Sequence, residues 1–368
     1  MRQMPRRIKD TAGKSLVIGD LPTGCKYCIK GQKLVLFVTG LCNKPNNCFW
    51  YCPISEKKKD NDVIYANELQ VTEDTDIVHE AQLMDAKGAG ITGGEPLLFP
   101  QRVLRYIHLL KESFGQRFHI HLYTNGVFLT RKLFSQLIEA GLDELRFQPY
   151  NDINEQLKWA DEYGLGIGIE VPVIPTADYI NKIKYFVRLL ENIDGSFINL
   201  NEFEFTESQA SELKKRGFVL KEGTFAAVKG SESTAIELLD WVRINSTITA
   251  HYCPIITKDQ YQLKNRLLRR AKNVAKPYEE VTEDGLLLKG VIKGDFSKET
   301  LNKLRNELIR EFNVPPKYIG INLQKNRLEI GGWILEELSL IFKEMGYKCG
   351  IVEEYPTADA LEVTYIPL

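Results

Sequence analysis

Six short apolar runs alternate with amphipathic stretches between residues 33 and 205, and this alternation limits the possible folds more than any other feature. The runs span 33–40, 88–94, 118–125, 144–149, 166–175 and 196–205, and helical periodicity occupies 73–87, 103–114, 131–140, 152–163 and 177–192 between them. Strands that alternate with helices predict right-handed crossovers and a parallel sheet. Six such units, at roughly 30 residues each, suit an open doubly wound sheet or an incomplete (βα)6 barrel.

Residues suited to chemistry follow the predicted strands. In parallel α/β folds the ligand site lies at the carboxyl ends of the strands. The cysteines of LFVTGLCNKPNNCFWYCP follow the first strand, ITGGEP follows the second and YTNG follows the third. The last three strands contribute polar residues at or near their ends: Arg146, Gln148, Glu170, Asn201 and Glu202. We therefore expect one edge of the sheet to carry the functional site.

Cys42, Cys48 and Cys52 form the strongest single motif. Three thiolates on one loop can hold three irons of a 4Fe–4S cluster and leave the fourth iron open to an outside ligand. A structural zinc loop would need a fourth ligand nearby. The next Cys or His along the chain is His79, on a predicted helix outside the loop. The trio therefore favours a catalytic iron–sulfur cluster over a structural zinc site.

The segment ITGGEPL, residues 91–97, offers a ligand-binding turn. Gly93 and Gly94 carry no Cβ, so the backbone can approach a bound molecule closely there. Glu95 provides a carboxylate that can accept hydrogen bonds from a ligand ammonium group. A lone GGE is more often a turn with a solvated Glu, but its place next to the cysteine trio favours the binding role.

The cysteine trio, the aromatic Tyr51 directly before its last cysteine, and GGEP after the second strand together resemble the radical S-adenosylmethionine (SAM) superfamily. More narrowly, the sequence is similar to archaeal proteins described as related to pyruvate formate-lyase activating enzymes. The likeness covers about residues 20–205. That family usually has C-x3-C-x2-C, whereas this chain has C-x5-C-x3-C, and the loop NKPNN absorbs the first insertion.

The resemblance implies a 4Fe–4S cluster on the three cysteines, with its open iron chelated by the amino and carboxylate groups of SAM. It implies reductive cleavage of SAM to a 5′-deoxyadenosyl radical that takes a hydrogen atom from a substrate, with an electron donor of the ferredoxin or flavodoxin type. The residues that it places around SAM are Tyr51, Gly93, Gly94, Glu95, Thr124 and Asn125. By hypothesis, Arg146 meets the SAM carboxylate and Glu170 the ribose hydroxyls. Gln148 and Asn201 complete the candidate set.

Cys25 and Cys28 form a C-x2-C pair with the spacing of a metal knuckle. Downstream, HYC supplies His251 and Cys253. Together the four side chains would complete a tetrahedral zinc site or help to hold an auxiliary iron–sulfur cluster. The alternative is a surface thiol pair and an unrelated buried cysteine.

The run KDQYQLKNRLLRRAKNVAK, residues 258–276, carries seven cations against a single acid. Clustered Arg and Lys on one helix predict phosphate contacts with an RNA, and a solvated helix face is the alternative. The whole chain has 48 Lys and Arg against 49 Asp and Glu, so any nucleic-acid contact depends on a local patch of this kind.

Residues 285–368 predict a small α+β sandwich of ferredoxin-like kind. Ser297 is placed to cap a helix, and Phe296 with Leu301 to form a hydrophobic staple. One apolar helix face follows, formed by Leu301, Leu304, Leu308 and Phe312.

The predicted fold class is α/β, with a partial (βα)6 barrel of radical-SAM type and the small C-terminal domain. The predicted domains are an N-terminal segment with the C-x2-C knuckle (1–32), the partial barrel (33–231), a helical basic connector (232–284) and the C-terminal domain (285–368).

Composition favours a cytoplasmic protein that does not enter a membrane. Seven cysteines, an odd number spread unevenly, do not fit a secreted disulfide framework. The basic N-terminus is not followed by the apolar core of a signal peptide. No apolar run approaches the ~20 residues that a membrane span needs.

The sequence therefore predicts a radical SAM enzyme whose substrate stays open. The basic run favours an RNA, and the resemblance favours a glycyl-radical partner protein. An alternative function, of a different class, is that of a non-catalytic iron–sulfur or zinc protein that binds RNA or relays electrons. Glu95 argues against this class, because an electron carrier needs no ammonium clamp beside an open iron.

Overall fold

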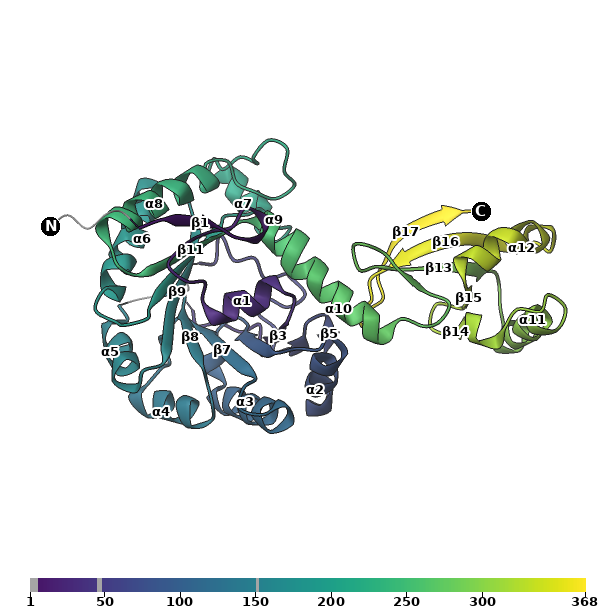
Figure 1. The fold of residues 1–368 in the computed structure, drawn as a ribbon, viewed down its shortest axis with the longest axis horizontal. Helices are drawn as coiled ribbons and strands as arrows, with labels where there is room; N and C mark the ends of the chain where they lie inside the picture. Colours follow the sequence, from purple (N-terminus) through teal and green to yellow (C-terminus); the bar gives the residue numbers. More distant parts are fainter. Residues whose placement is uncertain (1–5, 45–47, 150–151) are drawn as a thin grey trace. The chain divides into compact units, whose positions relative to one another are not determined.

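The computed structural model describes residues 6–44, 48–149 and 152–368. The chain divides into two compact units, the first of residues 1–82 and 86–263 and the second of residues 83–85 and 264–368. Figure 1 shows the elements of both units. The four segments predicted from the sequence are a finer division than these two units, and they stay a prediction.

The six predicted strands of the first unit are present and lie side by side in the order of the sequence. They are β3 (Lys33–Phe37), β6 (Gly88–Thr92), β7 (His119–Thr124), β8 (Glu144–Phe147), β9 (Gly166–Val173) and β10 (Phe197–Glu202), each parallel to its neighbour. The prediction of a parallel sheet is confirmed for these strands. A doubly wound sheet reverses its strand order at one point, and these six strands do not.

Further strands extend this sheet at both edges, so that the sheet is mixed. β11 (Thr249–Cys253) lies parallel to β10, and β2 (Leu16–Ile18) and β1 (Ile8–Asp10) continue beyond it in antiparallel pairing. At the other edge, β4 (Tyr65–Ala66) and β5 (Leu69–Gln70) follow β3. Within the described residues the sheet therefore has eleven strands.

Helices cover the outer face of the sheet (Figure 1). They are α2 (Asp74–Leu83), α3 (Pro100–Phe114), α4 (Arg131–Glu139), α5 (Asn154–Tyr163), α6 (Ala177–Leu190) and α8 (Ser231–Asn245). A short helix, α7 (Ala210–Lys215), precedes α8. Among the described helices, none is both long enough and apolar enough to cross a membrane.

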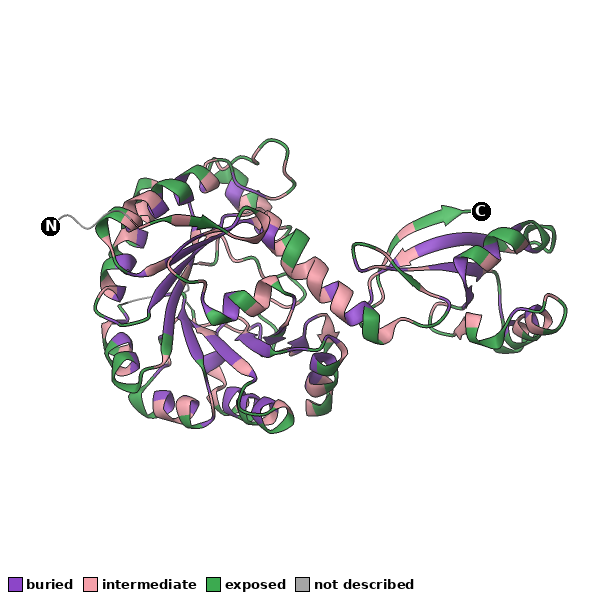
Figure 2. Ribbon diagram, viewed as in Figure 1, coloured by how far each residue is buried: buried purple, intermediate pink, exposed green. Residues whose placement is uncertain are grey.

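The side chains of the parallel strands alternate between two environments. Residues such as Ile91 and Leu122 are wholly buried. Figure 2 shows that much of the strands beneath the outer helices is buried. The alternate residues point to the inner face, where His121, Arg146 and Glu170 lie. Because successive strand residues face opposite sides, this alternation places the polar residues of several strands on one surface.

Two parts of the first unit differ from the prediction. The segment 232–284 was expected to be helical, but it contains β11, whose alternate residues Ala250 and Tyr252 are buried. The C-x2-C pair was expected in a metal knuckle, but it lies on the helix α1 (Thr23–Ile29), after a 3-10 turn at Ala12–Lys14. The strand β11 and the helix α1 are both short, and a short apolar pattern does not distinguish a helix from a strand or a loop.

The second unit contains a five-stranded antiparallel sheet path and two long helices. After α9 (Ile255–Thr257) and a π-helical turn (Lys258–Leu263) in the first unit, its elements are α10 (Lys264–Val274), β12 (Glu280–Val281), β13 (Leu287–Lys293), α11 (Lys298–Arg310), β14 (Ile319–Asn322), β15 (Arg327–Ile330), α12 (Gly332–Glu344), β16 (Lys348–Glu354) and β17 (Glu362–Pro367). The strand order is β14-β15-β13-β16-β17, and β12 pairs with β13.

Local signals in the second unit are confirmed. Ser297 Oγ accepts a hydrogen bond from the backbone N–H of Thr300 at 3.1 Å and so caps α11. Phe296 and Leu301 are both buried in the same apolar core, as a hydrophobic staple requires. The predicted apolar face lies in this core: Leu301, Leu304 and Leu308 are buried, and Phe312 packs against them.

Most cations of the basic run 258–276 are engaged within their own unit. Their partners are Glu204 for Lys258, Asp284 for Lys264, the Met84 carbonyl and Asp85 for Arg269, the Pro356 carbonyl for Arg270, and Glu329 for Lys276. A phosphate backbone would have to compete with these internal partners. The expected RNA-binding face is therefore not presented as a continuous basic surface.

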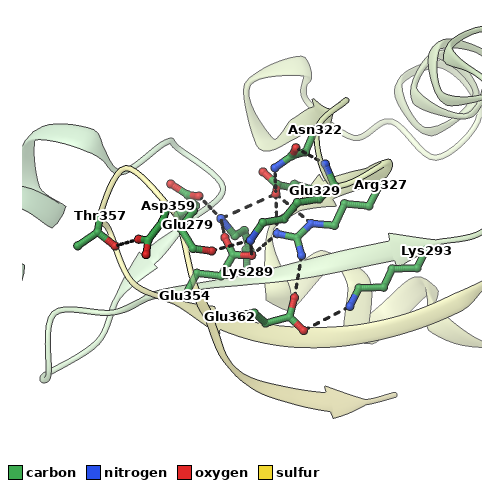
Figure 3. A network of polar contacts seen from close by, with 12 residues as sticks. Glu279, Lys289, Lys293, Asn322, Arg327, Glu329, Glu354, Thr357, Asp359 and Glu362 are labelled. Carbon is green, nitrogen blue, oxygen red and sulfur yellow. Dashed lines mark hydrogen bonds and ion pairs between the residues drawn. The ribbon is translucent and has the colours of Figure 1, made fainter. Parts of the chain in front are cut away.

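A buried ion network holds the second unit together (Figure 3). Arg327, Glu329 and Glu354 are each only 1% exposed. Lys289 Nζ lies 2.8 Å from a Glu354 oxygen, and Lys325 Nζ lies 2.6 Å from the other. Arg327 forms ion pairs with the carboxylates of Glu329 and Glu354. Paired charges of this kind are tolerated in a core, whereas a single one left without its partner is strongly destabilising.

We expect the stability of the second unit to fall at acid pH. Burial alone would raise the pKa of Glu354, but hydrogen bonds from Lys289 and Lys325 lower it from 4.5 to about 2. The folded pKa is below the unfolded value, so this stabilisation is present above pH 4.5 and is lost as the pH falls towards 2. The loss is on the order of 3 kcal/mol.

The substitution Glu354→Gln tests the same network at neutral pH. Removal of one partner from a buried ion pair costs about 3–5 kcal/mol. The control is Glu353→Gln on the same strand, with an expected change within about 0.5 kcal/mol. Hydrogen exchange of peptides from the second unit measures the loss of stability in both variants. Equal protection in the two variants would contradict the prediction.

Candidate active site

The inner face of the parallel sheet carries polar residues that adjacent strands place side by side. Tyr123 on β7 is in register with Arg146 on β8. Glu170 on β9 is in register with Asn199 on β10, which in turn is in register with His251 on β11. Strand pairing therefore assembles a polar surface from residues more than a hundred positions apart in the sequence.

This surface borders a cavity of about 480 Å³, which is in the range of small-molecule sites. Its lining includes nearly every residue that the sequence predicted for the site: Cys25, Cys28, Cys42, Cys48, Tyr51, Gly93, Gly94, Glu95, Thr124, Asn125, Arg146, Gln148, Glu170, Asn201, His251 and Cys253. Cys52 is half-buried but does not border the cavity.

The three cysteines of the trio lie on the loop after β3. All three are half-buried free thiols. Burial, together with the neighbouring Cys52 and Cys42 thiols, raises the pKa of Cys48 to about 11, so the three sulfurs lie within electrostatic reach of one another. Residues 45–47, which include part of the predicted NKPNN loop, lie outside the described residues.

The donor set fits an iron–sulfur cluster better than a zinc ion. Among the described residues, no three His, Cys, Asp or Glu side chains are gathered as the ligands of a single metal ion. A structural zinc ion needs such convergence, usually of four ligands. A 4Fe–4S cluster is larger and takes one thiolate on each iron, so its ligands need not meet at one point.

The two glycines of ITGGEP allow the backbone to pack against the start of the cysteine loop. A Cβ on Gly93 would lie 2.5 Å from the Thr39 carbonyl oxygen, and one on Gly94 would lie 2.1 Å from that of Leu41. The N–H of Gly94 donates to the Thr39 carbonyl at 2.7 Å. The glycines were expected to allow a ligand to approach the backbone. In the structure they allow the start of the cysteine loop to pack against it.

Glu95 joins the ends of two strands. Its Oε1 accepts hydrogen bonds from the Leu97 N–H at 2.9 Å and the Thr124 hydroxyl at 2.8 Å, and its Oε2 accepts from the Asn125 N–H at 2.7 Å. The side chain is only 1% exposed, and this burial raises its pKa. Asn125 also reaches the cysteine loop, where its Nδ2 donates to Asn43 Oδ1 at 2.6 Å.

Tyr51 lies in an aromatic cluster beside the cavity. Its ring centre is 4.9 Å from that of Trp50 and 6.2 Å from that of Tyr179, both in edge-on arrangements. Phe203 completes the cluster at 6.3 Å. Burial raises the pKa of Tyr51, and Gln148 hydrogen-bonds its side chain. The ring that was expected against adenine is thus fixed by packing and borders the cavity.

Arg146 and Glu170 form a hydrogen bond with each other in this structure. Arg146 Nη1 donates to Glu170 Oε2 at 2.8 Å, and its Nε donates to Glu144 Oε1 at 2.5 Å. Glu170 also accepts hydrogen bonds from Asn199 at 2.9 Å and Asn201 at 3.0 Å. Desolvation acts to raise the pKa of Glu170, but the Arg146 charge and the hydrogen bonds from Asn199, Asn201 and Arg146 together outweigh it, and the pKa is lowered.

The predicted second metal site is not assembled in this conformation. Both ring nitrogens of His251 are engaged, Nε2 with Ser15 Oγ at 2.7 Å and Nδ1 with Asn199 Oδ1 at 3.1 Å. Cys25 also contacts Asn199, whose Nδ2 lies 3.4 Å from its sulfur. His251 therefore has no free nitrogen for a metal, although it borders the same cavity as the cysteines.

Sequence reasoning missed several polar residues of the inner face. Asn199, Glu144 and Tyr123 all join the network around Arg146 and Glu170. Each lies two residues along the chain from a position that the sequence had singled out, namely Asn201, Arg146 and Asn125 respectively. Period-two spacing along each strand was the signal that could have found them.

Comparison with known proteins finds matches in both units of the chain. A family model described as the radical SAM superfamily matches residues 22–149, and one described as a domain of unknown function, DUF8061, matches residues 285–368. A protein of Methanocaldococcus jannaschii, provisionally named a glycyl-radical enzyme activating enzyme, is 42% identical over 362 residues. The match covers 95% of this chain and 93% of that protein.

Solved structures of radical SAM proteins are also similar. SuiB of Streptococcus suis bound to S-adenosylmethionine matches with a TM-score of 0.39 and 12% identity, over 61% of this chain and 50% of that chain. This chain thus spans half the length of SuiB. A radical SAM methyltransferase of Sphaerobacter thermophilus matches with a TM-score of 0.39 and 13% identity, over 70% of this chain and 79% of that one.

The family match at the cysteine loop and the nearly full-length relative show that this chain belongs to the radical SAM superfamily, whose members are enzymes that use a 4Fe–4S cluster and S-adenosylmethionine.

Proposed function

We propose that this enzyme activates a glycyl-radical partner protein. The observation that carries the proposal is the shared cavity bordered by the cysteine loop, the Gly93–Glu95 turn and the polar inner face of the sheet. The name of the M. jannaschii relative supports the choice of partner. A ferredoxin- or flavodoxin-type protein is the proposed electron donor.

Cys42, Cys48 and Cys52 are the proposed ligands of the cluster. When bound, the cluster and SAM together supply a 5′-deoxyadenosyl radical that removes a hydrogen atom from the substrate. All three thiols are half-buried, and Cys42 and Cys48 border the cavity, which supports this role.

Glu95 is the proposed acceptor for the SAM ammonium group. A carboxylate offers about four lone-pair positions, and three hydrogen bonds to Glu95 use three of them. One position on Oε2 is therefore left for a ligand. An ammonium group there would also favour the ionised carboxylate, which burial otherwise disfavours by raising its pKa.

Finer features of the fold belong to the same proposal. We infer that the large sheet is a partial (βα)6 barrel, and the unreversed strand order supports this. We infer that the second unit is ferredoxin-like, since its elements follow the order β-α-β-β-α-β from β13 to β16. The cytoplasmic location stays a prediction.

An RNA substrate has little support in the structure. The basic run that predicted it has most of its cations engaged with acidic side chains or carbonyl oxygens. The RNA hypothesis therefore stays a prediction, and we do not propose it as the function.

Anaerobic reconstitution with iron and sulfide tests the cluster. We expect about four irons per chain, and 5′-deoxyadenosine on addition of dithionite and SAM. Cys48→Ser should lower 5′-deoxyadenosine by at least about a hundredfold, because a ligand to the cluster is lost. Cys349→Ser is the matched control, since Cys349 lies buried in the second unit. Full activity in Cys48→Ser would refute the ligand assignment.

Glu95→Gln tests the ammonium acceptor. The amide nitrogen of Gln is a donor, so it cannot satisfy all of the donors that Glu95 accepts, and we expect a stability loss of about 1–3 kcal/mol. SAM affinity of the reconstituted protein should also fall about tenfold or more, measured by equilibrium dialysis. The control is Glu112→Gln, an exposed position on α3. Unchanged affinity in Glu95→Gln would remove Glu95 from the SAM site.

Electron paramagnetic resonance tests the partner class. Reduced enzyme and SAM are mixed with each glycyl-radical protein of the source organism, and we expect a glycine-centred radical on one of them. Deuteration of glycine in that partner should narrow the signal, which identifies the radical position. If 5′-deoxyadenosine forms but no candidate acquires a glycine radical, the proposed partner class is wrong.

A further inference from the structure

Cys25 and Cys28 have no role in the proposed function, yet they border the same cavity as the cluster cysteines. Both are carried by α1, which lies against the inner face of the sheet. The Gly24 N–H donates to Glu144 Oε2 at 3.4 Å, and a Cβ on Gly24 would lie 2.5 Å from Arg146 Nη2. The close seating of Gly24 fixes α1, and so the two thiols, in the cavity wall.

The surroundings of Cys25 suit a thiol that takes part in electron transfer. Its sulfur lies 3.4 Å from Arg146 Nη2 and 3.4 Å from Asn199 Nδ2. These donors stabilise negative charge on sulfur. Burial nevertheless raises the pKa of Cys25 and raises that of Cys28 to about 12, so both residues keep their S–H bonds at neutral pH.

The spacing of the pair allows a disulfide. Residues i and i+3 on a helix lie on the same face, with Cα atoms about 5 Å apart. Disulfides span Cα separations of roughly 4.4–6.8 Å, but their Cβ atoms lie about 3.5–4.5 Å apart, closer than the about 5–6 Å of such a helical pair, so the disulfide requires a local adjustment of α1. All seven cysteines, which are described, are free thiols in this structure, and Cys25 and Cys28 are the two closest in sequence.

A metal site is the weaker use of these thiols. His251, the nearest predicted co-ligand, bonds Ser15 and Asn199 through its two ring nitrogens. Among the described residues, no three potential ligands are gathered around one point. Cys25 and Cys28 are thus two free thiols that border the cavity of a radical SAM enzyme.

We propose that Cys25 and Cys28 form a redox dithiol that donates one hydrogen atom and one electron to the chemistry of this cavity. The proposal rests on the radical SAM activity described above. It gives the enzyme an internal source of reducing equivalents when no substrate is bound.

The steps balance as follows in atoms and electrons. The S–H bond of Cys25 breaks, and its hydrogen atom forms a C–H bond with the carbon-centred radical of SAM cleavage. The Cys25 sulfur radical then bonds to the Cys28 sulfur, whose proton leaves to water. The remaining electron passes to the oxidised iron–sulfur cluster. The net change converts SAM and a dithiol into methionine, 5′-deoxyadenosine, a disulfide and one proton.

Deuterium oxide provides the test, because thiol hydrogens exchange with solvent and carbon-bound hydrogens do not. Reconstituted full-length enzyme is given SAM and one equivalent of reductant without a partner protein. We expect 5′-deoxyadenosine that carries one deuterium. Cys25→Ser should lower this deuterium content at least tenfold, whereas Cys349→Ser should leave it unchanged.

A second measurement does not depend on turnover. Wild-type apoprotein is equilibrated in glutathione buffers of graded potential, and peptides are mapped by mass spectrometry. We expect a reversible disulfide between Cys25 and Cys28. This disulfide measurement uses only the wild-type protein, so it remains valid even if Cys25→Ser does not fold.

The outcomes separate the two proposals. Undeuterated 5′-deoxyadenosine from the wild type, a stoichiometric metal ion on Cys25 and Cys28, or no disulfide at any potential would overturn the dithiol role and leave the radical SAM function intact. No 5′-deoxyadenosine from protein with an intact cluster would overturn the proposed function and the dithiol role with it.

Discussion

The close approach of two backbone segments at the strand ends underlies the whole site. The N–H groups of Gly94 and Glu95 donate to the carbonyls of Thr39 and Leu41 at 2.7 and 2.8 Å. Any side chain on Gly94 would collide with the Leu41 carbonyl oxygen. This contact joins the cysteine loop to the turn that carries the buried carboxylate. The cysteine loop and the Glu95 turn therefore border the same cavity.

Paired charge governs the rest of the inner face. Arg146 lies between Glu144 and Glu170, so no charge of this buried group is isolated. An unpaired charge there would carry a large desolvation cost, which the attraction within a hydrogen-bonded pair offsets. The same pairing leaves Arg146 Nη2 close to the Cys25 sulfur, at 3.4 Å. The network thus both stabilises the sheet and shapes the chemistry that the cavity wall can support.

Much of the first unit could be predicted from the sequence, because strand alternation and the cysteine motif are local patterns. The six parallel strands, the cysteine trio and the placement of Glu95 beside the cavity all follow from such patterns. β11 was missed because five residues give too short a pattern to distinguish strand from helix. Asn199 was missed although it lies two residues before Asn201 on the same strand, a spacing that places both on one face.

The sequence by itself determined which residues face the inner side of the sheet and which chemistry they carry. Only the tertiary structure decided their partners. In the structure Arg146 bonds Glu170, His251 bonds Ser15 and Lys258 bonds Glu204. The physical reason is that partner choice depends on strand register and close approach between distant segments, and no local pattern of residues encodes either.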